Sequence, residues 1–590
     1  MKLSLCAALC GLWTIAAAGE LTALADSMRF DASGMVIEAG ASPPSRSIEL
    51  EGARGGYVSC QVAVKLARPG GYRLSVDAFP VASGLETDVY REWLHWVPAA
   101  KRHYPDALIP VRTPYSGTLP DPDNRVAGQT AQAFWIDVWI PERARPGAYA
   151  VTVRLNGDGT ESSMPLRVRV LPGAIPADDA VAIDHNSYGT SWFSSQYPKL
   201  ALAPGFYDSE QFYELIHAYH RLFYEHRGVF HQLGYGHGGK VGPEFAPRLE
   251  GSGKTRRIAD WTAYDRHYGP LFDGSAFART RRGPRPVPFA YLPVNPEWPA
   301  SFLWWGEAGY EREFVNVMSA MEGHFREKGW TQTRLELFFN HKKRYKGFPW
   351  DGDEARFARD YAYMKEYARL MRAAVPAGSP VKFVFRADVS WTMERQFREL
   401  AGVVNFWVCG GGMFSWYREA LPALKQRGDI VWIYGGTPPV SEPLSHMATD
   451  PLRTWQMGVD GFVRWQTVDP GPDPWFQSNG GGETLVYPGD RFGVRGPLAS
   501  IRLKAERNAL QDLAVLKALG SREEAARRFN GTIPDEWWTA RPAIADTDPD
   551  DWSNATIDDA EVRSPKFANI DADAWKRVRE YAMRLAGEAH

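Results

Sequence analysis

The 590-residue sequence has few cysteines and no excess of either charge. Its four Cys do not have the spacing of a zinc site. With 68 Lys and Arg against 70 Asp and Glu, the formal net charge is −2 at pH 7. This balance lacks the basic excess that nucleic acids and anionic membranes attract. We therefore expect neither nucleic acid nor, after removal of an N-terminal signal, a membrane as a partner.

Sequence signatures of common cofactor and metal sites are also missing. No glycine-rich segment follows a strand and opens a helix in the phosphate-binding pattern, and there is no Gly-x-Ser-x-Gly nucleophile elbow. His231 and His237 flank a glycine-rich loop, but no carboxylate lies nearby at ligand spacing. We expect no cofactor and no metal.

Long apolar runs are restricted to the N-terminus, where LSLCAALCGLWTIAAA follows Lys2. This run is too short for a stable membrane span. With Ala23-Leu24-Ala25 behind it, it predicts a signal peptide over residues 1–25, cleaved before Asp26, and a periplasmic or secreted protein. A retained anchor is the alternative. Cys60 and Cys409 remain in different predicted domains, so we expect two separate buried thiols, although export would permit a bridge.

The pattern of predicted strands and helices divides the rest of the chain into two large parts and a short one. Residues 26–172 contain strands and turns, and FWIDVWIPERARPGAYAVTVRL alternates apolar and polar residues, which predicts a β-sandwich. A linker rich in Pro and Ala covers 171–179. Over 180–520, strand patterns alternate with amphipathic helices, which predicts a (β/α)8 barrel of the TIM type. Residues 521–590 form a predicted helical extension. The strands expected in the barrel are 180–186, 229–233, 287–294, 335–340, 381–386, 404–409, 430–434 and 461–465.

Active sites of such barrels lie at the C-terminal ends of the strands. Candidates for substrate binding or catalysis are the polar residues at these ends: Asp184, Asn295, Glu297, Asn340, His341, Arg386, Asp388 and Asp469. Aromatic residues make up 13% of the chain, and many of its 23 Trp stand beside Gly, Pro or Asp, which favours loops and a binding cleft. Trp407, Tyr434, Trp465 and Trp475 are candidates for stacking on a sugar ring.

The segment 458–513 carries a spaced set of motifs. A Gly458-x-x-Gly461-x-x-x-Trp465 strand precedes Asn479-Gly480 and the turn Tyr487-Pro488-Gly489. Ser500 then opens a basic amphipathic helix that carries Arg502, Leu503, Arg507 and Asp512. This segment resembles the C-terminal part of the catalytic domain of glycoside hydrolase family 123. The resemblance implies a β-sandwich followed by a barrel that acts on N-acetylhexosaminides.

The resemblance also implies a catalytic pair. In that family an adjacent Asp and Glu directly follow the fourth barrel strand. The Asp orients the substrate's own acetamido group, which acts as nucleophile, and the Glu is the general acid/base. Here the fourth predicted strand ends in Asn340-His341-Lys342 instead, and an Asp353-Glu354 pair occurs only further along.

Two hypotheses remain open for this pair. In one, the longer loop folds Asp353 and Glu354 back over the barrel mouth as the catalytic groups. In the other, Asp353 is the N-cap of the next helix and Glu354 lies in its first turn. Asp388 is a further candidate carboxylate, with a salt bridge to Arg386 as the alternative. His341 is either a core histidine or an acid/base.

The sequence therefore favours an exported glycoside hydrolase that cleaves a glycan, with a β-N-acetylhexosaminide as the candidate substrate and a substrate-assisted retaining mechanism. The alternative is a catalytically inactive carbohydrate-binding protein on a barrel scaffold, because fold alone does not decide function. Two carboxylates facing the mouth would favour the first, and aromatic platforms without them the second.

Overall fold

The structure is a computed structural model. It describes residues 19–38, 43–157, 159–189, 192–236, 241–295, 298–300, 307–343, 348–355, 357–390, 393–414, 417, 419–469, 471, 473–476, 482–528 and 569–589. None of the helices in these ranges is sufficiently long and apolar for a membrane crossing.

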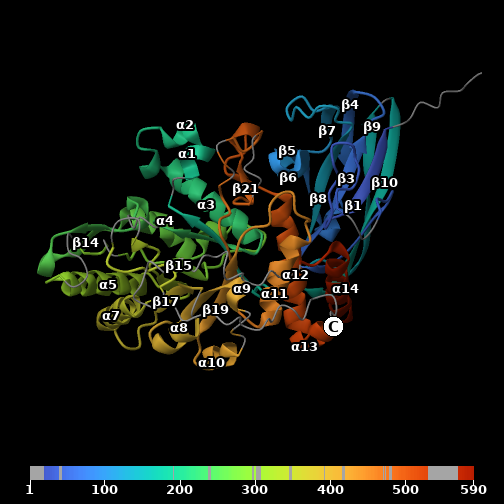
Figure 1. Cartoon of the computed structure of the whole chain (residues 1–590). Helices are drawn as coiled ribbons and strands as arrows, with labels where there is room; N and C mark the ends of the chain where they lie inside the picture. Colours follow the sequence, from blue (N-terminus) through green and yellow to red (C-terminus); the bar gives the residue numbers. More distant parts are fainter. Residues whose placement is uncertain are drawn as a thin grey trace, which may run out of the picture.

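Two five-stranded sheets form the N-terminal part, drawn in blue and cyan in Figure 1. All neighbouring strands are antiparallel except β2 and β10, which pair in parallel. One has the order β1 (Glu20–Ala25), β3 (Gly56–Lys65), β8 (Ala131–Ile140), β5 (Glu86–Val97) and β6 (Arg102–Val111). The other has the order β2 (Ile48–Arg54), β10 (Thr160–Ala174), β9 (Gly147–Gly157), β4 (Gly70–Val76) and β7 (Tyr115–Leu119). Buried Val, Leu, Ile and Phe from both sheets share one core, because alternate residues of each strand face inward.

Strand β8 departs from this alternation because its other face is covered as well. All ten of its residues are buried. Phe134, Ile136 and Val138 belong to the core between the sheets, whereas Trp135 packs with the second part of the molecule. The sequence alternates as predicted, but both faces of the strand are enclosed.

The second part is a nearly closed barrel of eight parallel strands. Their order is β12 (Val229–Leu233), β11 (Ala182–Tyr188), β20 (Gly461–Arg464), β19 (Ile430–Gly435), β18 (Phe406–Gly410), β17 (Lys382–Val389), β16 (Arg334–Leu337) and β15 (Phe289–Tyr291). The terminal strands β12 and β15 lie next to each other without forming a ladder. Each strand overlaps the range expected from the sequence, and β12 matches it residue for residue.

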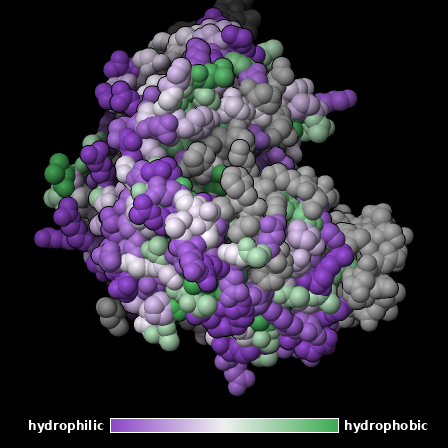
Figure 2. Space-filling model, turned by 90° about the vertical axis from the view of Figure 1, so that its left-hand side faces the viewer, coloured by the Kyte–Doolittle hydropathy of each residue, from purple (hydrophilic) through white to green (hydrophobic). Residues whose placement is uncertain are grey.

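Helices surround the strands, as Figure 1 shows. The longer ones are α3 (Glu210–Glu225), α4 (Thr262–Phe272), α5 (Tyr310–Glu327), α7 (Ala358–Ala374) and α11 (His446–Met457). The shorter ones are α1 (Trp192–Gln196), α2 (Pro198–Ala201), α8 (Met393–Glu399), α9 (Gly411–Phe414) and α10 (Ala420–Gln426). Hydrophilic side chains predominate on the face seen in Figure 2, and hydrophobic ones are scattered in small groups. This matches helices that turn one apolar stripe inward.

The unit after β12 has little regular structure. A small hairpin, β13 (Arg248–Glu250) with β14 (Arg257–Asp260), precedes α4. Another pair, β21 (Val486–Pro488) with β22 (Pro497–Ala499), follows the last barrel strand. Short 3-10 turns fill the connections, at 81–83, 98–100, 206–208, 243–245, 253–255, 275–277 and 490–492.

Helix α12 (Ile501–Leu519) joins the barrel to the sheets. The Ser500 hydroxyl caps it by accepting a hydrogen bond from the Leu503 amide. We predicted an amphipathic helix, and this was wrong: residues 501–516 are buried all round, because the helix lies between the two parts (Figure 1). Its basic residues are paired across that junction: Arg502 with Asp106 at 2.8 Å, and Arg507 with Asp137 at 2.8 Å.

The C-terminal helix α14 (Ala572–Glu588) packs on α12 and on β10 and β2. Gly173 lies so close to Ala586 that a Cβ atom there would come within 2.8 Å of its backbone. Arg579 of α14 pairs with Asp26 at 2.6 Å and with Asp512 at 3.1 Å. The short α13 (Arg522–Arg528) precedes it in the chain. Much of the predicted extension, residues 529–568, lies outside the described residues.

The two thiols Cys60 and Cys409 are free and buried, which confirms the expectation of separate thiols. Burial raises the pKa of both, so they stay protonated at neutral pH.

Strand β1 bears on the expected N-terminal cleavage site. All six of its residues pair with β3, from Glu20 opposite Lys65 to Ala25 opposite Cys60. Leu21 and Leu24 are buried, at 5% and 4% exposure. Cleavage directly before Asp26 would remove this strand and expose the edge of β3, an unfavourable state for a sheet.

We predict that a variant starting at Asp26 is less stable than one starting at Gly19. Burial of Leu21 and Leu24 contributes roughly 1.5–3 kcal/mol each. The melting temperatures of the two purified variants, measured side by side, test this. Equal melting temperatures would mean that β1 is dispensable.

Candidate active site

A chain of buried charged side chains crosses the barrel interior. His231 on β12 contacts Asp184 on β11 through Nδ1 (2.7 Å) and Glu336 on β16 through Nε2 (3.0 Å). Arg386 on β17 pairs with Glu336 at 3.1 Å and lies 3.5 Å from Asp184. Its other edge holds Asp388 in two hydrogen bonds, of 2.7 and 3.1 Å. Side chains from four strands therefore fix the position of one carboxylate, Asp388.

Alternation along the strands accounts for this network. Residues two apart on a strand face the same side, so Arg386 and Asp388 both point into the barrel. Burial opposes the charged ring of His231, but Glu336 and Asp184 outweigh it and raise the pKa of His231 to about 9. The Tyr291 ring stacks on His231, and the Tyr291 hydroxyl accepts a hydrogen bond from Arg386 at 2.7 Å. The interior thus contains paired charges at neutral pH.

Asp388 lies at the upper end of this chain, with its side chain 18% exposed. Burial raises the pKa of Asp388 to about 6, and the nearby Asp353 and Glu336 add to the rise against the opposing effect of Arg386. Such a carboxyl group exchanges a proton near neutral pH, as acid/base catalysts do. The predicted salt bridge to Arg386 is present, and it does not remove Asp388 from the mouth.

The connection from β16 to α7 places Asp353 and Glu354 above the same opening. The amides of Gly352 and Asp353 both donate to the His341 carbonyl, at 3.0 and 3.3 Å, which closes the loop on itself. A Cβ atom on Gly352 would lie 2.4 Å from Phe339 Cβ, so the close turn needs glycine. Glu354 has a φ of 52°, a left-handed conformation that is uncommon outside glycine and is frequent at functional sites.

This geometry excludes the N-cap hypothesis for the pair. Helix α7 begins at Ala358, and Phe357 occupies its N-cap position. Asp353 and Glu354 therefore precede the helix, and the N-cap interpretation was wrong. The chain folds the pair back toward the strand ends instead.

The pair contacts side chains from other strands. The Tyr434 hydroxyl at the end of β19 donates to Glu354 Oε1 at 2.7 Å. Lys342 Nζ lies 2.8 Å from Asp353 Oδ2 and 3.6 Å from Glu354 Oε2. Burial raises the pKa of Tyr434, and so do the negative charges of Glu354, Asp353 and Asp388. All three carboxylates therefore lie within electrostatic range of one phenol.

An aromatic pair stands on the far side of the opening. Trp465, directly after β20, is 43% exposed and donates from Nε1 to the Tyr188 hydroxyl at 2.8 Å. Burial raises the pKa of Tyr188, helped by the charges of Asp353 and Asp388. The exposed Trp465 face is available for stacking on a ring.

The other predicted site residues lie deeper or elsewhere. Asn340 and Asn295 are buried at strand ends, and the backbone N–H of Asn340 donates to the Tyr235 hydroxyl at 3.0 Å. His341 is fully buried against Phe348 and Trp350, and burial lowers its pKa to about 3. It is a neutral core histidine, so neither acid/base catalysis nor substrate contact fits it. Glu297 lies outside the described residues.

Two aromatic predictions were wrong. Trp407 is fully buried on the outer side of β18, where it packs on Phe397 and donates to Asp429 at 3.0 Å. Trp475 packs against Trp93 of β5, and its carbonyl accepts from the Trp93 indole at 2.9 Å. It belongs to the junction with the sheets and not to the mouth.

Sequence reasoning missed Tyr188 and Glu336 as parts of this arrangement. A signal existed for Glu336, because a single carboxylate inside the apolar strand Leu335-Glu336-Leu337 is expensive to bury without a partner. Tyr188 and Lys342 gave no comparable signal, since their positions depend on loops that the chain brings together from distant segments.

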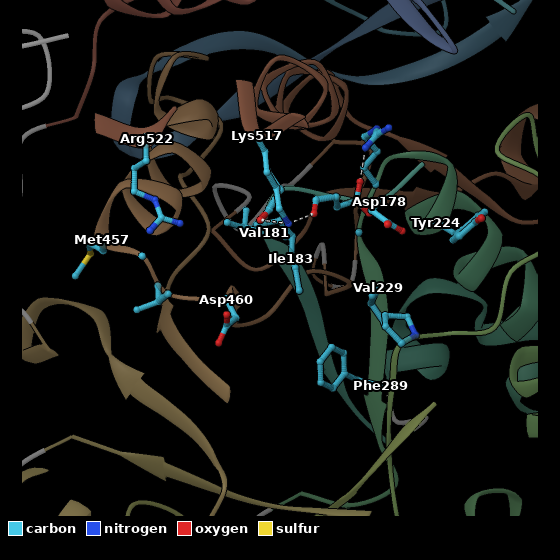
Figure 3. A pocket seen from close by; sticks show the side chains of 18 of the residues that line it. Asp178, Val181, Ile183, Tyr224, Val229, Phe289, Met457, Asp460, Lys517 and Arg522 are labelled. Carbon is cyan, nitrogen blue, oxygen red and sulfur yellow. Dashed lines mark hydrogen bonds and ion pairs between the residues drawn. The ribbon is translucent and has the colours of Figure 1, made fainter. Parts of the chain in front are cut away.

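A cavity of about 740 Å³ lies at the opposite end of the barrel (Figure 3). Residues at the starts of the strands line it, including Ile183, Val229 and Phe289. Its acidic residues are already paired with basic neighbours, as in Asp178 with Arg285 at 2.6 Å. Active sites of this architecture do not lie at that end. Among the described residues, no group of His, Cys, Asp and Glu is arranged to hold a metal ion.

We predict that part of the stability depends on the charge of His231. The raised pKa stabilises the fold fully below pH 6.5, and this contribution is lost as pH rises through about 9. It amounts to roughly 3 kcal/mol. Unfolding curves between pH 6 and 10, for the wild type and for His231→Asn, test this. The wild type should lose stability more steeply, and parallel pH dependences would contradict the assignment.

Comparison with family models and with curated proteins gives no match. Among solved structures, the fold is similar to that of a family 123 glycoside hydrolase from Clostridium perfringens, with 13% identity, a TM-score of 0.63, and 96% of this chain and 97% of that chain covered. A Parabacteroides merdae β-glucuronidase matches at 9% identity and a TM-score of 0.29, over 78% of this chain and 50% of that one. An α-galactosidase-like protein from Bacteroides fragilis matches at 11% identity and a TM-score of 0.25, over 83% and 80%. Only the first of these TM-scores is high enough to bear on the fold, and it supports the fold that the resemblance implied.

Proposed function

We propose that this protein is an exported glycoside hydrolase, in which a β-sandwich and a (β/α)8 barrel cooperate to cleave a glycan. The observation that carries the proposal is the convergence of Asp353, Glu354 and Asp388 at the C-terminal ends of the strands, opposite the exposed Trp465. Carboxylates beside an aromatic face are the groups that glycosidic cleavage requires.

The proposed substrate is a β-N-acetylhexosaminide. Asp353 accepts a hydrogen bond from the acetamido N–H and turns the acetamido oxygen toward the anomeric carbon. That oxygen attacks the carbon while the glycosidic bond breaks, and Glu354 gives its proton to the leaving oxygen. Water then attacks the anomeric carbon, Glu354 takes the proton from the water, and the acetamido group is restored. Two displacements retain the configuration.

Several contacts support these roles. The Tyr434 hydroxyl orients Glu354, and Lys342 holds Asp353 from the side. Asp388 lies close enough to Asp353 for each charge to affect the other. We assign Asp388 to the same site as a second acidic partner, positioned by Arg386. A carbohydrate-binding protein without catalysis would need the aromatic face but not this group of carboxylates.

We predict that Glu354→Gln lowers turnover of an aryl N-acetyl-β-hexosaminide by about 10²–10⁴-fold, because the acid/base is lost. Glu366→Gln, on a partly exposed position of α7 where the side chain pairs with Arg369, serves as the matched control and should leave turnover unchanged. Steady-state kinetics of both purified variants give the answer. Normal turnover by Glu354→Gln would remove the residue from the mechanism.

We also propose that export removes fewer residues than the sequence first suggested. Ala16-Ala17-Ala18 has the small residues that a signal peptidase requires, and cleavage after Ala18 keeps strand β1 in its sheet. Asp26, which accepts hydrogen bonds from Arg579 and Asn508, would then lie within the chain and would not carry the free N-terminus.

We predict that the protein recovered from the periplasm or medium begins at Gly19. Intact-mass measurement and N-terminal sequencing distinguish this start from Asp26. Protein that keeps Met1 and remains in the cytoplasm would refute export altogether.

A further inference from the structure

A second cavity, of about 380 Å³, opens at the rim of the barrel mouth. It lies between the end of β11, helix α1 and the loop after β20, and its lining includes Ser187, Tyr188, Trp192, Ser195, Gln466 and Asp469. Its volume falls within the roughly 300–1,000 Å³ range of ligand sites.

Tyr188 connects this rim cavity to the candidate active site. It lines the cavity, and its hydroxyl accepts the hydrogen bond from Trp465. The charges of Asp353 and Asp388 act on the same phenol. A ligand that extends past the Tyr188–Trp465 pair from the carboxylates would therefore enter the rim cavity.

The lining suits a neutral, hydroxyl-rich ligand. Trp192 and Tyr188 provide aromatic surface, while Ser187, Ser195 and Gln466 provide hydrogen-bonding groups. The Ser187 hydroxyl is buried and has no hydrogen-bond partner within the described part of the chain. A buried polar group without a partner is costly, and a ligand hydroxyl would satisfy it.

The charge of the lining residues narrows the choice of ligand further. Among the described residues that line the rim cavity there is no Lys, Arg or His, and Asp469 is the one carboxylate. A uronic acid or a sulfated sugar would meet this negative charge without a compensating cation. The cavity at the other end of the barrel, by contrast, is lined by several Arg and Lys side chains.

We propose that the rim cavity binds a second, uncharged sugar residue, so that the substrate is a glycan of at least two residues. This inference rests on the proposed function. The Tyr188–Trp465 pair separates the residue held at the carboxylates from the one held in the rim cavity.

The experiment compares two substrates on three proteins. The substrates are an aryl N-acetyl-β-hexosaminide and a neutral disaccharide or trisaccharide ending in the same sugar. The proteins are the wild type, Ser195→Trp, which fills the cavity, and Ser194→Trp, an exposed neighbour on α1 that does not line it. Ser195→Leu is the smaller replacement if Ser195→Trp fails to fold, as judged by its melting temperature.

We expect Ser195→Trp to lower kcat/KM for the oligosaccharide at least about tenfold more than for the aryl glycoside, a difference of about 1.4 kcal/mol. Ser194→Trp should leave the ratio of the two constants unchanged. The inference would be overturned if Ser195→Trp lowered kcat/KM equally for both substrates or left both unchanged. It would also be overturned if Ser194→Trp changed the ratio of the two constants as much as Ser195→Trp does.

A charge test uses the matching oligosaccharide in which a uronic acid replaces the second residue. The wild type should cleave it more slowly than the neutral compound, and Asp469→Asn should reduce that difference. An equal preference in both proteins would contradict the assignment of Asp469. A wild type that cleaves no glycoside at all would instead overturn the proposed function itself.

Discussion

The candidate site depends on the ionic chain inside the barrel. Arg386 is fully buried, and a guanidinium in such a place is tolerated only with well-placed carboxylates around it. Glu336, Asp184 and Asp388 supply them, and His231 contributes a second cation. Because Glu336 and Asp184 hold Arg386, and Arg386 makes two hydrogen bonds to Asp388, Asp388 reaches the mouth in one defined position. A purely apolar interior could not fix a carboxylate there.

The same principle holds the two halves of the molecule together. Asp137 lies in the middle of β8, and burial alone would raise its pKa. Arg507 and Lys504 of α12 outweigh burial and hold the pKa of Asp137 well below its usual value. The sheets thus bind helix α12, which also packs on α11 of the barrel. Trp475 is part of that junction, packed on Trp93. The loop after β20 is therefore held partly by the sheets.

Periodicity was sufficient to predict the strands, because inward-facing apolar residues and short helices mark each repeat. It was also sufficient to predict that polar residues at strand ends would converge. It could not predict on which side of β18 Trp407 lies, because a strand that is covered on both faces carries apolar residues on both. Nor could it decide whether Asp353 and Glu354 belong to a helix or to the mouth. That outcome depends on a tight turn at Gly352 and on partners from β19 and the end of β16. The all-round burial of α12 was missed for a related reason: its charged residues look exposed until their buried partners are known.

The most direct test of this account is a crystal structure of the Glu354→Gln variant with an uncleaved N-acetylhexosaminide. The account predicts the glycosidic oxygen within hydrogen-bond distance of the side chain at position 354, about 2.6–3.2 Å. The acetamido group should contact Asp353, and the sugar should stack on Trp465. A sugar bound at the opposite end of the barrel, or at the mouth with these carboxylates turned away from it, would contradict the account.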